Sequence, residues 1–250
     1  MSASESGHWY SQEGEPRYTI TGANGSERNT TLRDARKFGY VPSVTAILSV
    51  ADKPALTMWK VNQALMAALT LPQIAGESLD EFKKRAAVDA QVQAKEAAEE
   101  GTRIHWALES HFLCMPFNAQ YSDHVEAARN VINEAFPDQD WSPEKSFCSD
   151  LGYGGKVDLH SESIVLDFKT KDFGPDDKII AYDEQIMQLD AYRHGLGRPD
   201  ATMANLYLSR THPGETRLIV HSEGNHFQRF CHLLDYWKLS KNYEPMEIST

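Results

Sequence analysis

The stretch that decides the fold runs from Gly154 to Lys169 and reads Gly-Gly-Lys-Val-Asp-Leu-His-Ser-Glu-Ser-Ile-Val-Leu-Asp-Phe-Lys. Two short apolar runs are joined by a polar turn, which predicts a β-hairpin. Asp158 closes the first run and Asp167 the second. Residues placed symmetrically about a tight turn face each other, so the two carboxylates are expected near the same rung.

Two carboxylates on one rung repel each other unless a cation lies between them. The pair therefore predicts a divalent metal site, or else a different register. Lys169 lies two residues beyond Asp167, and the strand period of two points both side chains to the same face. A carboxylate pair and an ammonium are thus expected to converge at one strand end.

The Asp-x-Lys spacing alone is weak evidence. Two other acid-x-Lys triplets occur, one in a helix-forming stretch and one in a loop: Glu81-Phe82-Lys83 and Asp176-Asp177-Lys178. We expect both to be solvated charges. Only the third triplet follows an apolar run, Ile164-Val165-Leu166, and a buried strand that ends in an acid and a base can also be simply a strand leaving the core.

Length and composition are those of a soluble globular protein. The chain has 250 residues, of which 41% are hydrophobic and 24% charged, enough for one large domain. No apolar run approaches a membrane span, and the start of the chain lacks the regions of a signal peptide. We therefore expect a cytoplasmic protein with no membrane partner.

Charge and cysteines exclude further classes. The net charge of −11 argues against a protein that coats nucleic acid through bulk electrostatics, so any DNA contact needs a local basic track. Cys114, Cys148 and Cys231 have no Cys-x-x-Cys spacing, which argues against a zinc knuckle, a disulfide framework or an iron–sulfur cluster. We expect them to fill the core.

Periodicity and turn signals predict the remaining elements. We expect a small hairpin between residues 9–10 and 18–20, helices over 43–50, 55–69, 78–112, 123–136, 182–195 and 222–239, and strands over 144–148, 204–208 and 217–220. Ser43 and Ser222 are the expected N-caps. The second helix should bury Leu56, Trp59, Ala64 and Leu65. The expected organisation is an N-terminal polar hairpin extension without chemistry over 1–40, a single domain over 41–240 and a tail over 241–250.

Polar side chains on two of these helices are candidates for the same site. His105 and Glu109 lie one turn apart, as do Gln188 and Tyr192, so each pair can face one place. Gly101 marks a break or a close-packing point in its helix.

Taken in order, these residues resemble a known family. They are similar, in the same order, to the motifs of the RecB-like exonuclease branch of the PD-(D/E)XK nucleases. The matching residues are Gly101, His105, Glu144, Gly155 to Asp158, Asp167-Phe168-Lys169 and Gln188-Leu189-Asp190-Ala191-Tyr192. Pro42-Ser43-Val44-Thr45 and Trp59-Lys60 look like the mitochondrial genome maintenance exonucleases and their phage relatives. The likeness spans roughly residues 40 to 235 and, without four cluster-binding cysteines, implies the subgroup that lacks an iron–sulfur cluster.

The resemblance implies a fold and an activity. The fold is α/β (α+β), a restriction-endonuclease-like core with a central mixed sheet flanked by helices and a helical N-terminal portion. The activity is metal-dependent DNA exonuclease, preferring single strands or ends, in phage or bacterial recombination, replication or repair. A single-strand annealing or recombination protein is a further expected partner.

It also implies roles for the candidate residues. Mg²⁺ or Mn²⁺ would be held by Asp158, Asp167, the Phe168 carbonyl and His105. Lys169 would orient the attacking water or stabilise developing charge. Glu144 would support the metal site or its water, and Gln188 and Tyr192 would position the DNA backbone or the Lys169 ammonium.

Two other functions stay open at this point. One is a nuclease-fold module that binds DNA ends or a recombination partner without cutting them. The other is a zinc hydrolase that uses His105, His111 and His124, although no His-Glu-x-x-His motif is present. For a single-strand channel, the candidates are Lys60, Arg103, Arg193 and, for base stacking, Trp106.

Overall fold

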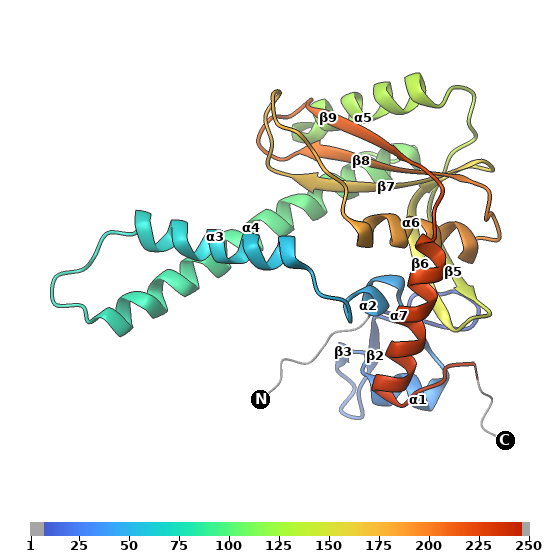
Figure 1. Cartoon of the computed structure of the whole chain (residues 1–250), viewed down its shortest axis with the longest axis horizontal. Coiled ribbons are helices and arrows are strands. Elements are labelled where there is room, and N and C mark those ends of the chain that lie inside the picture. Colours follow the sequence, from blue (N-terminus) through green and yellow to red (C-terminus); the bar gives the residue numbers. More distant parts are fainter. Residues whose placement is uncertain (1–7, 247–250) are drawn as a thin grey trace.

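A five-stranded mixed sheet forms the centre of the protein (Figure 1). The computed structural model describes residues 8–246. Within the sheet, each strand pairs with its neighbour in the chain, antiparallel everywhere except between β7 and β8. The strands are β5 (Ser142–Ser149), β6 (Tyr153–His160), β7 (Ile164–Lys171), β8 (Thr202–Ser209) and β9 (Thr216–His221). The expectation of a mixed sheet flanked by helices is confirmed.

The predicted hairpin is formed by β6 and β7. Leu159 pairs with Leu166 and His160 with Val165, and Ser161 closes the turn. Continuing this register by one residue places Asp158 opposite Asp167, where the ladder between the two strands has ended.

Helices cover both faces of the sheet. One face packs on α2 (Val44–Leu48), α6 (Asp183–Gly195) and α7 (His226–Lys241). The other packs on α4 (Leu79–Phe112) and α5 (Ser122–Ala135), which follows the short η1 (Ala119–Tyr121). Successive residues of β7 alternate between the two cores, Val165 in the first and Leu166 in the second, as the strand period requires. Asp167 and Lys169 are therefore directed to the side of α6.

The predicted N-terminal hairpin is formed in part: Tyr10 forms an antiparallel bridge with Pro16 and the Arg17 N–H donates to the Trp9 carbonyl at 2.7 Å, but residues 19–21 pair with a later strand. The segment contains β1 (Trp9–Tyr10), β2 (Thr19–Thr21), β3 (Glu27–Asn29), α1 (Leu32–Phe38) and β4 (Val41–Pro42). The strand β1 pairs with β4, while β2 pairs with β3. Trp9 is buried and its ring contacts that of Trp237 on α7, so apolar burial draws β1 to the body of the protein.

A helical arm extends away from the sheet (Figure 1). It consists of α3 (Pro54–Thr70) and the first half of α4. The expectation that α3 buries its apolar residues is wrong: Leu56, Ala64 and Leu65 are exposed, Trp59 is half-buried, and Ala67 alone among the residues of α3 is buried. The physical reason is that α3 packs against α4, so one face of the helix is covered.

The boundaries of the other predicted helices agree with the structure except at α7, whereas α1 was not predicted. Ser43 caps α2 as expected, but α7 begins at His226 after Asn225, so Ser222 is not its cap. Its inward residues Phe230, Leu234 and Trp237 are buried. The predicted tail from 241 lies partly outside the described residues. Cys114 is exposed and the other cysteines are partly buried, so they are not core residues.

None of the helices described in the structure is long and apolar enough to cross a membrane.

Candidate active site

Three carboxylates occupy one line across β5, β6 and β7. Pro143 pairs with Leu159 and Lys145 with Val157, so Glu144 lies opposite Asp158. Asp158 in turn lies opposite Asp167 by the register of the hairpin. The sequence predicted the second of these relationships. The first depends on how β5 aligns, which no local signal determines.

Asp167 is the deepest of the three carboxylates, with 3% of its surface exposed. Its Oδ1 accepts a hydrogen bond from Gln188 Nε2 at 3.2 Å. Its Oδ2 accepts one from Asn205 Nδ2 at 2.9 Å and forms an ion pair with Lys169 Nζ at 2.6 Å. Both oxygens are thus held by donors from three different elements.

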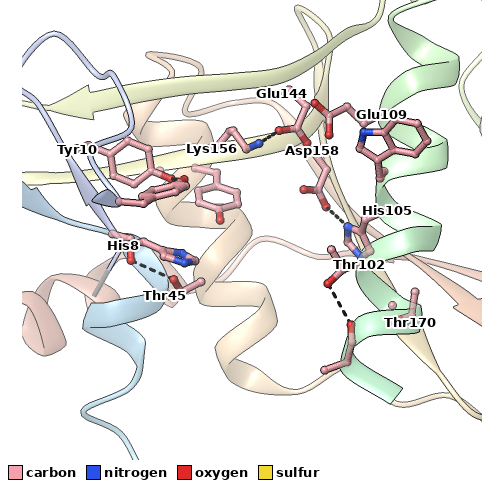
Figure 2. A pocket seen from close by; sticks show the side chains of 17 residues that line it. His8, Tyr10, Thr45, Thr102, His105, Glu109, Glu144, Lys156, Asp158 and Thr170 are labelled. Carbon is pink, nitrogen blue, oxygen red and sulfur yellow. Dashed lines mark hydrogen bonds and ion pairs between the residues drawn. The ribbon is translucent and has the colours of Figure 1, made fainter. Parts of the chain in front are cut away.

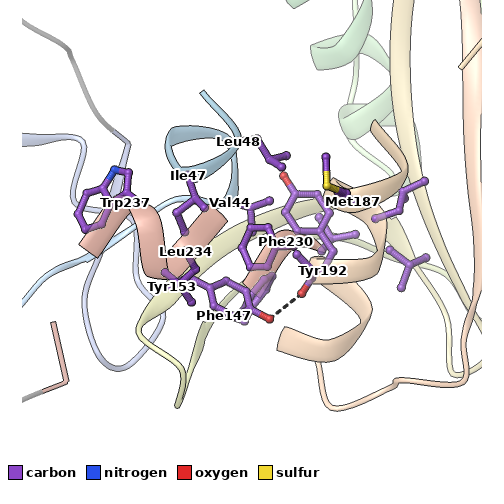
Figure 3. Packing of buried hydrophobic residues seen from close by; sticks show 14 of the residues in the cluster. Val44, Ile47, Leu48, Phe147, Tyr153, Met187, Tyr192, Phe230, Leu234 and Trp237 are labelled. Atoms are coloured by element: carbon purple, nitrogen blue, oxygen red, sulfur yellow. Dashed lines mark hydrogen bonds between the residues drawn. The ribbon is translucent and has the colours of Figure 1, made fainter. Parts of the chain in front are cut away.

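Gln188 joins the predicted residues of α6 to those of β7. Besides Asp167, its amide contacts Lys169 Nζ at 3.1 Å through Oε1 and donates to the Tyr192 hydroxyl at 2.8 Å through Nε2. Tyr192 is buried against the core (Figure 3), and a Cβ on Gly155 would come within 2.8 Å of its ring. Close packing at Gly155 therefore fixes the phenol that orients the Gln188 amide.

Asp158 lies between the hairpin and α4. Its Oδ2 accepts a hydrogen bond from the backbone N–H of Phe168 at 2.8 Å and lies 3.7 Å from His105 Nδ1. The helix α4 approaches closely because Gly101 lies against Thr170, where a Cβ would stand 2.5 Å from the hydroxyl oxygen. Gly101 is a close-packing point and not a break, since α4 continues through it.

Electrostatics at the site favour a bound cation. Burial raises the pKa of the Asp167 carboxyl, and the charge of Asp158 raises it further, although Lys169 acts in the opposite direction. Burial and the neighbouring Asp167 also raise the pKa of Tyr192, so its hydroxyl stays protonated. A cation near the two carboxylates would relieve the cost of keeping Asp167 ionised in this buried position.

A cleft of about 560 Å³ opens beside Asp158 (Figure 2). The sheet contributes Glu144, Lys156 and Asp158, and α4 contributes His105 and Trp106. Half of the Trp106 surface is exposed, so the residue is not core packing. The opposite wall comes from the N-terminal segment, whose sequence suggested no chemistry: His8, Tyr10 and Tyr18.

The donor set fits a hard cation that keeps most of its own water. Among residues 8–246, no three His, Cys, Asp or Glu side chains converge to form a ready-made metal site. Mg²⁺ is usually held by one or two carboxylates together with waters and substrate phosphates, not by a complete protein cage. Asp158 and Asp167 offer such a pair, and His105 and the Phe168 carbonyl stand beside it as the nitrogen and neutral oxygen donors that were expected.

Three residues around the site were missed by sequence reasoning. Asn205 and His221 continue the network behind Asp167, with His221 Nε2 2.8 Å from Asn205 Oδ1. Lys156 forms an ion pair with Glu144. An Asn inside the apolar run of β8 was a usable signal, because a fully buried amide needs hydrogen-bond partners.

Other candidates lie away from the site. Arg193 is buried and pairs with Asp190 and Glu223, so it is a structural residue and not part of a DNA channel. Lys60 is exposed on the arm, and Arg103 pairs with Glu99 and Glu100.

The zinc site is not formed either. His124 is buried, with Nε2 3.0 Å from the Ser209 carbonyl oxygen. Among the described residues it does not converge with His105 and His111 on a common point.

No protein family model and no curated protein matches this chain. Solved structures do include similar chains. One is the crystal structure of SSO0001, which is 14% identical over 74% of this chain and 86% of that chain, with a TM-score of 0.37. A likeness this weak carries no argument about function.

Proposed function

We propose that this protein is a Mg²⁺- or Mn²⁺-dependent deoxyribonuclease of the RecB-like PD-(D/E)XK type. The observation that carries the proposal is the Asp158, Asp167 and Lys169 group: the continued hairpin register brings the two acidic residues to one rung, and the Lys169 ammonium lies 2.6 Å from Asp167. The sheet flanked by helices and the order of the motifs agree with such a core.

The chain's own residues have separable roles. Asp158 and Asp167 would hold the cation, which lowers the pKa of bound water and neutralises charge on the phosphate. Lys169 is positioned by Gln188 and Asp167 to orient the attacking water or to stabilise charge that develops in the transition state. Tyr192 fixes the Gln188 amide, so it acts through Lys169.

The substrate is proposed to be single-stranded DNA or a frayed end. A chain of net charge −11 repels a polyanion, so productive binding must come from the cleft. Trp106 and Tyr18 line it with partly exposed rings, and aromatic side chains stack on unpaired bases without regard to sequence. A strand that enters the cleft by its end would make the enzyme an exonuclease.

Digestion of labelled DNA tests the proposal. Linear single strands, closed circular single strands and blunt duplexes are incubated with the protein in Mg²⁺, Mn²⁺, Zn²⁺ or EDTA. Cleavage in Mg²⁺ or Mn²⁺ that EDTA stops, fastest on linear single strands, is the expected result. Circles cut as fast as linear strands would refute end entry, and binding without cleavage would indicate a module that holds DNA ends.

A further inference from the structure

The cleft is poor in positive charge. Lys156 is the sole Lys or Arg among the described residues that line it, against three carboxylates from Glu109, Glu144 and Asp158. The nearby Lys169 is committed to Asp167 and Gln188. A DNA strand carries one negative charge per phosphate, so its entry requires a cation that faces the cleft.

Lys156 has the position that such a cation needs. It precedes Asp158 by two residues on β6, and both side chains reach the cleft (Figure 2). Its side chain is 37% exposed, whereas that of its partner Glu144 is 17% exposed. The charge of Lys156 also reaches the opposite wall of the cleft: burial lowers the pKa of His8, and the Lys156 charge lowers it further.

Glu144 is held in an unusual backbone conformation. Its φ of 57° lies in the left-handed region, which residues other than glycine rarely occupy. The ladder is intact on either side of it, at Pro143 and Lys145. Strain of this kind persists where the surrounding structure imposes it, and it is concentrated at functional sites. The strained residue here is Glu144, whose carboxylate forms its ion pair with the Lys156 ammonium. It does not point to a site shared with Asp158 and Asp167.

We propose that Lys156 binds a backbone phosphate of the DNA strand in the cleft, and that Glu144 positions this ammonium and is not a metal ligand. This assigns Glu144 a different role from the metal support expected from the sequence. The inference rests on the proposed function only for the identity of the ligand.

Binding without metal tests Lys156. The affinity of the full-length chain for a labelled linear single strand is measured in EDTA over a series of salt concentrations. Lys156→Gln is expected to weaken binding at least about fivefold at low salt and to flatten the slope of log K against log salt by about 0.7. The DNA affinity of Lys156→Arg should stay within about twofold of the native value, because the substitution keeps the charge.

The matched control is Lys145→Gln, which replaces an exposed lysine on β5 outside the cleft and should leave the slope unchanged. Equal slopes for Lys156→Gln and the native chain would overturn the inference.

A double-mutant cycle tests Glu144. The loss of DNA affinity caused by Lys156→Gln is measured in the native chain and again in Glu144→Gln. If Glu144 positions Lys156, this loss should be at least about threefold smaller in Glu144→Gln. We expect millimolar Mn²⁺ to raise the Tm of the native chain, and Glu144→Gln should keep this rise. Independent effects of the two substitutions, or loss of the Mn²⁺ response in Glu144→Gln, would show that Glu144 does not have this role.

The outcomes separate this inference from the proposed function. Binding that depends on Lys156 without cleavage in any metal refutes the nuclease and supports the phosphate contact. If the chain cleaves DNA but the salt dependence of binding is the same in Lys156→Gln and the native chain, the nuclease is supported and the phosphate contact is refuted. Absence of DNA binding in all conditions refutes both.

Discussion

Asn205 Nδ2 lies 2.9 Å from Asp167 Oδ2 and joins the centre of β8 to the deepest carboxylate of the site. The same amide accepts from His221 through Oδ1, and an amide oxygen can only accept, so His221 Nε2 must carry the proton. The position of the Asp167 carboxylate is thus set by a network that reaches the edge strand β9.

Removing the Asn205 amide should damage both stability and activity. In Asn205→Ala a buried Asp167 oxygen loses a donor, which typically costs about 1–3 kcal/mol. We expect a lower free energy of unfolding in urea and at least about tenfold slower DNA cleavage. Asn130→Ala, which alters an exposed amide on α5, is the control. Unchanged stability of Asn205→Ala would show that the network is not formed.

Replacement of the central residues should abolish cleavage and preserve the fold. We expect Asp158→Ala, Asp167→Asn and Lys169→Ala each to slow DNA hydrolysis by at least about a hundredfold, because each removes a charge from a preorganised site. Circular dichroism checks the fold. Asp176→Ala, in the loop triplet, should retain full activity, and near-normal rates in Lys169→Ala would refute the proposed site.

Metal binding should stabilise the folded chain. Asp158 raises the pKa of Asp167, and a cation that neutralises both carboxylates binds the native state preferentially. We expect the Tm to rise at millimolar Mn²⁺ and the rise to shrink in Asp158→Ala. A Tm that does not respond in the native chain would count against a two-carboxylate site.

Stability should fall between pH 7 and pH 5 partly through His221. Burial lowers the pKa of this side chain, with a smaller contribution from His226. As the pH falls below the ordinary histidine pKa, the unfolded chain binds a proton that the folded chain does not, so stability is lost. His221→Gln removes this titration and should lose less stability in urea unfolding over the same interval. His232→Gln, at an exposed position, should behave like the native chain.

Arg193 should be required for folding and not for DNA binding. Arg193→Ala leaves Asp190 buried without its guanidinium partner, and breaking such a pair costs about 3–5 kcal/mol. We expect a lower Tm, with unchanged DNA affinity for the fraction that remains folded. Arg103→Ala, on the exposed face of α4, should keep the native Tm.

Local patterns predicted the parts of this fold that local physics determines. The hairpin followed from two apolar runs and a turn, and its register placed Asp158 opposite Asp167. The pairing of Gln188 with Tyr192 followed from helical spacing. Both relationships depend on residues near each other in the chain.

The remaining features depend on contacts between distant segments. Trp9 keeps its turn with Arg17, but it also pairs with Pro42 and packs on Trp237, contacts with distant segments that the local pattern does not indicate. Arg193 also pairs with Glu223, 30 residues further along the chain, and no helical pattern indicates that contact. The apolar residues of α3 suggested a helix buried in the core. In the part of the chain that the structure describes, only α4 packs extensively on it, and the sequence of α3 does not indicate how many neighbours it has.

The helix α4 runs without interruption for 34 residues. At 1.5 Å per residue it is a rod about 50 Å long, and its part from Ala98 onward forms one wall of the cleft. The turn between α3 and α4, residues 71–78, lies at the far end of that rod, roughly 30 Å along the helix from the first cleft residue, Ala98. A fluorophore or a tether attached there would label the arm, or hold the protein on a surface, without entering the cleft.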